Sequence, residues 1–136
     1  MVVTPSEKTR VVAAVIERDG RYLVGERPTN KRHGGLWEFP GGKLEFGETV
    51  FGAAKRELAE ELGVQVLAVG EKLYAIEDPG SNFVIEFHST QITGEPVCHE
   101  HSALVWASVD DLLPMALAPS DRKFVLHLNG TTPSLE

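Results

Sequence analysis

The chain has 136 residues, of which 42% are hydrophobic and 24% charged, as in a soluble globular protein. Its formal net charge of −7 argues against a general binder of nucleic acid or anionic membranes, and no apolar run approaches transmembrane length. The single Cys98 excludes an internal disulfide and, with a polar N-terminus, suits a cytoplasmic protein. We expect one domain over residues 1–136, with short flexible ends at about 1–9 and 129–136.

The first predicted elements are two strands that form a hairpin. Residues 11–16 are a nearly continuous apolar run, which predicts a buried strand. The pair Asp19-Gly20 is a strong hairpin signal, and residues 21–25 alternate and return as the partner strand. The next ten residues, 26–35, form a predicted loop with Gly34-Gly35.

This loop is basic although the chain as a whole is acidic. It carries Arg27, Lys31, Arg32 and His33. One interpretation is an ordinary solvated loop. The other is a rim that attracts a triphosphate, with Arg27 as a substrate contact.

A short strand is predicted at residues 36–39, ending at glycines that let a ligand approach the backbone closely. A helix over residues 49–62 follows, because apolar side chains recur at every fourth position as far as Leu62. Gly63 then acts as a helix stop.

Three carboxylates of this helix, Glu57, Glu60 and Glu61, fall within one arc about 100° wide beside the apolar stripe. Like charges this close repel one another, and hard divalent cations, which take oxygen ligands, relieve that repulsion. The alternative is a solvated acidic face without a ligand.

The rest of the chain predicts more strands, a turn and two further helices, hence a mixed sheet between helices in an α/β or α+β arrangement. In order, the elements are a strand over 64–75 interrupted near 70–72, a turn at 78–81, strands over 82–92 and 102–107, a short helix capped by Ser108, and a final helix over 121–128 capped by Ser120.

The segment 42–64 fits G-x5-E-x7-R-E-U-x-E-E-x-G-U, with U a bulky aliphatic residue, at every fixed position. This pattern resembles the signature of the Nudix hydrolases. Residues 36–43, and residues 94–96 with Glu100, are similar to MutT-type members. Residues 11–21, 99–106 and 117–121 resemble the bacterial CTP pyrophosphohydrolases of the same family. The resemblance covers nearly all of residues 10–128 and implies an α/β/α sandwich around a mixed, partly antiparallel sheet.

The resemblance also implies a site for Mg²⁺ (Mn²⁺ is the alternative). The metal ligands it implies are the carbonyl of Gly41 and the side chains of Glu57, Glu60, Glu61 and Glu100. Either Glu57 or Glu100 would be the general base. Arg56 would orient a catalytic glutamate through a bidentate pair, with Glu48 as a further partner, unless it is only a surface ion pair.

For the substrate, Asp121 stands where MutT-type members have an asparagine that reads the base. An ionised aspartate only accepts hydrogen bonds, so it would suit the amino group of cytosine or the N1–H and 2-amino groups of 8-oxoguanine. The alternative is a first-turn helix residue at the dipole. Phe39 or Phe83 would stack on the base, or pack in the core. Lys43 is a further predicted substrate contact.

The predicted activity is cleavage of a nucleoside triphosphate, 8-oxo-dGTP or a cytosine nucleotide, to the monophosphate and pyrophosphate. One alternative is hydrolysis of a dinucleoside polyphosphate or a nucleotide sugar. Another is a nucleotide-sensing module that has lost catalysis, although such modules usually lose helix glutamates. We expect a nucleotide partner, no nucleic acid or membrane partner, and a monomer or homodimer.

Overall fold

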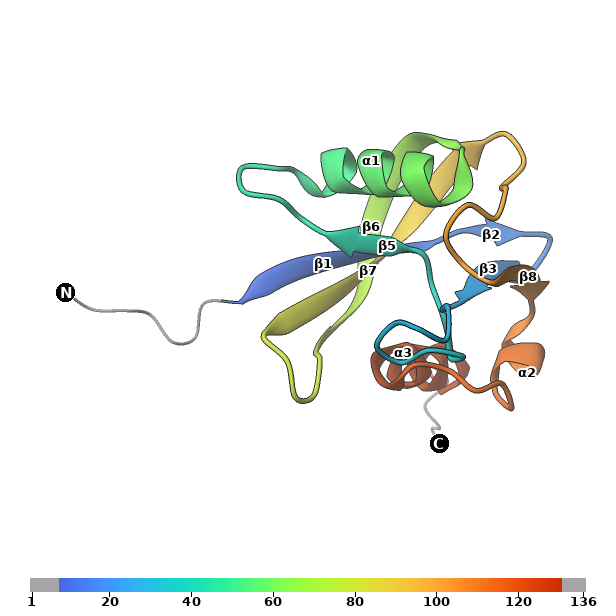
Figure 1. Cartoon of the computed structure of the whole chain (residues 1–136). Helices are drawn as coiled ribbons and strands as arrows, with labels where there is room; N and C mark the ends of the chain where they lie inside the picture. The colour runs from blue at the N-terminus through green and yellow to red at the C-terminus, as the bar shows by residue number, and fades with distance from the viewer. Residues whose placement is uncertain (1–7, 131–136) are drawn as a thin grey trace.

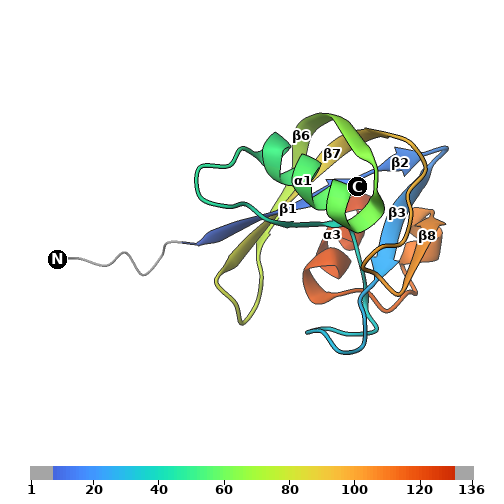
Figure 2. The same cartoon turned by 45° about the horizontal axis from the view of Figure 1, so that its top comes forward.

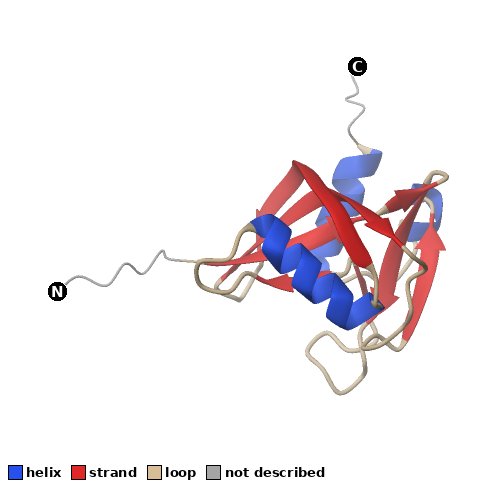
Figure 3. Ribbon diagram, turned by 90° about the horizontal axis from the view of Figure 1, so that it is seen from above, coloured by secondary structure: helices blue, strands red, loops and turns tan. Residues whose placement is uncertain are grey.

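The fold is built around a four-stranded mixed sheet in a computed structural model that describes residues 8–130. Its strands lie in the order β5-β1-β7-β6; β1 and β7 are parallel, and the other two pairs are antiparallel. Helices α1 and α3 cover opposite faces (Figure 1), and α1 lies across the strands when seen from above (Figure 3). This confirms the expected α/β/α sandwich. The bounds are β1 Thr9–Val15, β5 Gly41–Lys43, β6 Gln65–Glu77, β7 Phe83–Thr93, α1 Val50–Leu62 and α3 Pro119–Asn129.

Strand β1 is apolar on both sides because both of its faces are covered. Ala14 packs in one cluster with Leu58 of α1. Ala13 packs in another with Phe87 and Phe124, whose rings stack with centroids 4.4 Å apart. The continuous apolar run is therefore the pattern of a central strand buried between two layers.

A second, antiparallel sheet lies beside the first and contains the predicted hairpin. Strands β2 and β4 pair with one edge of β3, and β8 pairs with the other edge. Asp19 and Gly20 both have positive φ, at 54° and 77°, as a tight hairpin requires. The bounds are β2 Glu17–Arg18, β3 Arg21–Glu26, β4 Trp37–Glu38 and β8 Ala103–Ala107.

Helix α1 begins and ends where the sequence predicts. The side chain of Thr49 accepts a hydrogen bond from the Gly52 amide, and Gly63 ends the helix in the left-handed region. Two carbonyls of the last turn are bound by the loop before β8. The amide of Val97 donates to the carbonyl of Leu62 (2.8 Å), and that of His99 donates to the carbonyl of Glu61 (3.1 Å).

The C-terminal helices differ from prediction in one cap. Ser108 caps α2 (Val109–Leu112) in a capping box, as expected. Ser120 does not cap α3, which begins after Ala118 with Pro119 in its first turn. Its hydroxyl instead donates to the carboxylate of Asp78 (2.7 Å), because that buried aspartate needs a partner.

The strands also depart from prediction in two places. The interruption expected near 70–72 is a set of register shifts within one continuous β6. Residues 41–43 include the glycines at which the predicted strand was expected to end, and they form β5. Of the predicted flexible ends, Thr9 lies in β1 and Asn129 in α3, and the remainder falls almost wholly outside the described residues. No helix within residues 8–130 is long and apolar enough to cross a bilayer.

Candidate active site

The two glycines of β5 bring this strand close to β1 and to the helix carboxylates. A Cβ at Gly41 would lie 1.9 Å from the carbonyl oxygen of Val12, and one at Gly42 would lie 2.3 Å from the carboxylate carbon of Glu57. Neither contact can be accommodated without movement. The signature glycine, Gly42, therefore makes room for the Glu57 side chain.

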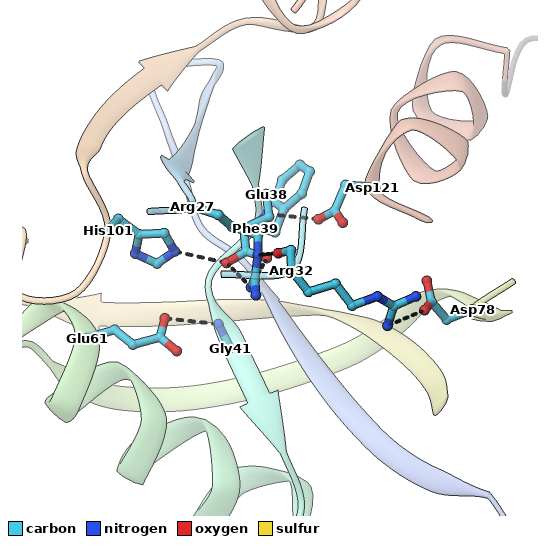
Figure 4. Close-up of polar contacts among 9 residues, drawn as sticks. All are labelled: Arg27, Arg32, Glu38, Phe39, Gly41, Glu61, Asp78, His101 and Asp121. Carbon is cyan, nitrogen blue, oxygen red and sulfur yellow. Dashed lines mark hydrogen bonds and ion pairs between the residues drawn. The ribbon is translucent and has the colours of Figure 1, made fainter. Parts of the chain in front are cut away.

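Two of the helix carboxylates, Glu57 and Glu61, lie against β5, whereas Glu60 is exposed. Glu61 is 7% exposed, and one of its oxygens accepts a hydrogen bond from the Gly41 amide (3.3 Å; Figure 4). Burial, together with the nearby charges of Glu57, Glu38 and Glu100, raises the pKa of Glu61 to about 9. The protein thus gathers carboxylates from three segments around one buried group.

Arg56 fastens this arrangement to the loop before the helix. Its guanidinium donates to both oxygens of Glu48 (2.8 and 2.9 Å), to Glu57 (2.9 Å) and to the carbonyl of Lys43 (3.0 Å). The bidentate partner is therefore Glu48, whereas the contact with Glu57 is a single bond. These bonds to Arg56 are the main reason why the pKa of Glu48 is lowered to about 2.

Two cavities border this region. The first, of about 360 Å³, lies between the basic loop and Glu100 and is called the Glu100 cavity below. Its lining residues are Arg27, Pro28, Lys31, Glu61, Glu100 and His101. Figure 2 shows the loop between β3 and β4 projecting beyond the end of β3. Arg27 and Lys31 of this loop line the Glu100 cavity, and their contact with phosphate stays a prediction.

The second cavity, of about 350 Å³, lies beside the start of α3 and is called the α3 cavity. Lys43 and Phe83 are both on its wall, and the Lys43 ammonium lies 5.0 Å from the centre of the Phe83 ring. Asp78, Ser120 and Asp121 also line it. The cavity combines an aromatic wall, cations and acceptor oxygens, which is the composition that a nucleotide site needs.

Phe39 and Asp121 are joined to each other. Phe39 is only 3% exposed, and its ring packs edge-on against Phe87 and Phe124, so Phe39 is a core residue and its ring is not available to stack on a base. Its amide donates to a carboxylate oxygen of Asp121 (2.9 Å). Asp121 thus uses one oxygen inside the protein, and its predicted contact with the base rests on the remaining acceptor capacity.

Asp121→Asn is expected to make the free energy of unfolding depend less on pH. Burial raises the pKa of Asp121 to about 8 from an ordinary 3.8. The folded protein therefore binds the extra proton between these values, and the free energy of unfolding falls as pH rises from about 4 to about 8. Asparagine keeps an acceptor for the Phe39 amide but cannot ionise.

Urea unfolding of both proteins at pH 5, 7 and 9 measures this difference. The variant should gain stability relative to the wild type as pH rises. Equal slopes against pH in the two proteins would show that Asp121 does not contribute. Other titrating groups are common to both proteins and cancel in the comparison.

Comparison with known proteins identifies this arrangement. Residues 7–128 match the family described as NUDIX domain. The chain belongs to the Nudix family. It is 44% identical over 114 residues to the CTP pyrophosphohydrolase of Escherichia coli, covering 82% of this chain and 84% of that one.

Two further comparisons agree with the family. An 8-oxo-dGTP diphosphatase of Haemophilus influenzae is 30% identical over 128 residues, which cover 90% of this chain and 93% of the relative. The solution structure of the E. coli ORF135 protein superposes with a TM-score of 0.78 at 38% identity, covering 98% of this chain and 99% of that one. The chain is thus a Nudix hydrolase in sequence and in fold.

Nudix hydrolases generally use divalent metal ions. Within residues 8–130, no three His, Cys, Asp or Glu side chains stand close enough to hold a metal, so the ligand set of Gly41, Glu57, Glu60, Glu61 and Glu100 stays a prediction. The donor chemistry nevertheless fits. Every predicted ligand is an oxygen, and the buried Glu61 lies among like charges that a divalent cation would offset.

Three features of the Nudix site were missed by sequence reasoning. Glu38, His101 and the pair of Asp78 with Ser120 all border the cavities. Glu38 carried one signal, because it is a charged residue between two aromatics in a short strand. His101 and His99 have the spacing of a metal pair but were interpreted as loop residues, and nothing in the sequence indicated the partners of His101 or Ser120, since each partner lies dozens of residues away.

Proposed function

We propose that this Nudix hydrolase cleaves a nucleoside triphosphate to the nucleoside monophosphate and pyrophosphate, with Mg²⁺ as its metal. The observation that carries the proposal is the position of the α3 cavity. Gly41 lines this cavity and also donates a hydrogen bond to Glu61, so the cavity adjoins a helix carboxylate. A base and sugar in this cavity would extend the phosphates toward α1. The names of the E. coli and H. influenzae relatives support the same activity.

In this mechanism the chain holds and orients the reacting groups. The bound metal would offset phosphate charge and lower the pKa of a water molecule. Glu57, Glu60, Glu61, Glu100 and the Gly41 carbonyl would hold it. Arg56 keeps the Glu57 carboxylate in place through its 2.9 Å bond. Either Glu57 or Glu100 would accept the proton from the attacking water.

The base would be read by acceptors of the α3 cavity, with Phe83 as the stacking surface. Asp121 carries a proton below its pKa of about 8, so it would accept from an amino group through its remaining lone pairs, and both cytosine and 8-oxoguanine are candidate bases. Lys43, Arg27 and Arg32 would attract the triphosphate to a chain that is otherwise acidic. We propose further that the metal is Mg²⁺ and not Mn²⁺. The protein would act in the cytoplasm, as a monomer or a homodimer.

A substrate panel with Mg²⁺ tests the proposal. It should include 8-oxo-dGTP, dGTP, CTP, dCTP, ADP-ribose and a dinucleoside polyphosphate, with monophosphate and pyrophosphate as readouts. The expected result is the highest kcat/KM for 8-oxo-dGTP or a cytosine nucleotide. Highest activity on ADP-ribose or the polyphosphate would move the protein to another Nudix substrate class.

Removal of the metal gives a second expected outcome. With excess EDTA, pyrophosphate release should fall to the uncatalysed background, because water activation and charge neutralisation are both lost. Added Mg²⁺ in excess of EDTA should restore it. Turnover that persists in EDTA would contradict the metal assignment. No turnover on any substrate would favour the sensing module, although all of the helix glutamates of the signature are present.

A further inference from the structure

His101 is a buried residue that the mechanism above does not use. It lies in the loop before β8, next to Glu100, and its side chain is only 4% exposed. Its Nε2 lies 3.0 Å from a carboxylate oxygen of Glu38, a residue 63 positions earlier in the chain. Figure 4 shows His101 and Arg27 converging on Glu38.

The His101 ring lies against Gly25 on its way to Glu38. Gly25 of β3 pairs with Glu38 on one side and with Leu104 of β8 on the other. A Cβ at Gly25 would lie 2.6 Å from two carbons of the His101 ring. The absence of a side chain at this one strand position therefore provides the slot in which the ring is held.

The hydrogen bonding of the ring is directed at Glu38 alone. Its Nδ1 is buried and has no hydrogen-bond partner among the described residues. An ionised carboxylate only accepts, so Nε2 is the donor. Leaving Nδ1 unpaired is a cost that an apolar residue of similar size would not carry. The bond to Glu38 is the side-chain hydrogen bond that offsets this cost.

Glu38 is held from a second side by Arg27, whose guanidinium lies 3.1 and 3.3 Å from its two oxygens. Glu38 lines the α3 cavity, while Arg27 lines both cavities and His101 lines the Glu100 cavity. The three residues therefore form the boundary between the two cavities. A carboxylate has about four acceptor positions, so Glu38 can still accept from a ligand.

We propose that His101 is a positioning residue that fixes the Glu38 carboxylate at the wall of the α3 cavity. There Glu38 accepts a hydrogen bond from an amino group on the substrate base. This inference rests on the proposed function, because it requires a nucleotide base in that cavity. It adds a determinant of specificity that the sequence pattern does not contain.

Binding of nucleoside monophosphates in EDTA tests the inference without turnover. Two matched pairs are used, CMP with UMP and GMP with IMP. CMP has an amino group where UMP has a carbonyl oxygen, and GMP has an amino group where IMP has only hydrogen. The wild type should prefer CMP and GMP. His101→Met, which keeps bulk but has no donor, should reduce that preference by about tenfold, the size of a lost charge-assisted hydrogen bond.

Two further variants separate positioning from a general structural role. His101→Gln keeps an N–H donor near the position of Nε2 and should restore the preference to within about threefold of wild type. In a double-mutant cycle, His101→Met should have no added effect on the preference once Glu38→Met is present. Melting temperatures are measured for each variant, and the preference ratio within one variant does not depend on how much protein is folded.

Each contrary result overturns the inference. Equal affinities within both pairs for the wild type would show that no acceptor reads the amino group. Equal weakening of both members of a pair in His101→Met would make the histidine only structural. An added effect of His101→Met in the Glu38→Met background would mean that it does not act through Glu38. The proposed function is judged separately, by pyrophosphate release from the wild type.

Discussion

Glu57→Gln is expected to lower kcat by on the order of 10³-fold while leaving the fold intact. The substitution keeps the size of the side chain but removes one of the charges that would hold the metal and accept a proton. The structure predicts little loss of stability, because Arg56 keeps its bidentate contact with Glu48. The measurement is pyrophosphate release under saturating nucleotide and Mg²⁺, alongside thermal unfolding.

Glu95→Gln is the matched control. Glu95 also accepts from an arginine at 2.9 Å, in this case Arg18, but its side chain is 81% exposed. The same chemical change there should leave both turnover and melting temperature near the wild-type values. A Glu57→Gln protein that retains turnover would refute the role assigned to Glu57.

The two neighbouring glycines of β5 are expected to respond differently to alanine: Gly41→Ala should lose stability, and Gly42→Ala should lose activity. At Gly41 the new Cβ would meet the backbone of Val12 at 1.9 Å, and the φ of 152° is one that alanine rarely adopts. Gly41→Ala should therefore lower the free energy of unfolding by more than about 3 kcal/mol. Urea unfolding at neutral pH measures this loss.

At Gly42 the three atoms nearest the new Cβ would all belong to the end of a flexible side chain, the Glu57 carboxylate. That carboxylate can move aside, so stability should change by less than about 1 kcal/mol, while kcat/KM should fall about 100-fold because the carboxylate is displaced. Each variant is the control for the other. A Gly42→Ala protein that is as active as the wild type would show that the position of Glu57 seen here is not needed for turnover.

Sequence predicted α1 and most of the strands well because their side chains repeat with a period set by the backbone. Leu58 and Leu62 report a helix face directly, and the alternation in residues 21–25 reports a strand. β5 has no such pattern. Its three residues, Gly41 to Lys43, become a strand only because β1 offers an unpaired edge. That edge is created by the tertiary fold.

Sequence can propose a site where one helix carries its residues, and it misses contacts where distant segments meet. The carboxylates of α1 lie on one element, so their spacing alone places them on one side of the helix, and their joint role as metal ligands stays a prediction. The bond from the Phe39 amide to Asp121 spans 82 residues, and that from His101 to Glu38 spans 63. Nor does sequence show whether the side chain that follows β4 points into the core, and Phe39 therefore was an open choice between stacking and packing.

Two backbone bonds also join the segment before Glu100 to the last turn of α1. The amides of Val97 and His99 lie in a loop, yet they bind carbonyls of the last turn of the helix. Breaking either bond exposes a helix carbonyl, so this loop and the end of α1 should unfold as one cooperative unit. We therefore expect the carboxylates of Glu100 and Glu61 to share one local opening equilibrium, although the two residues are 39 positions apart in sequence.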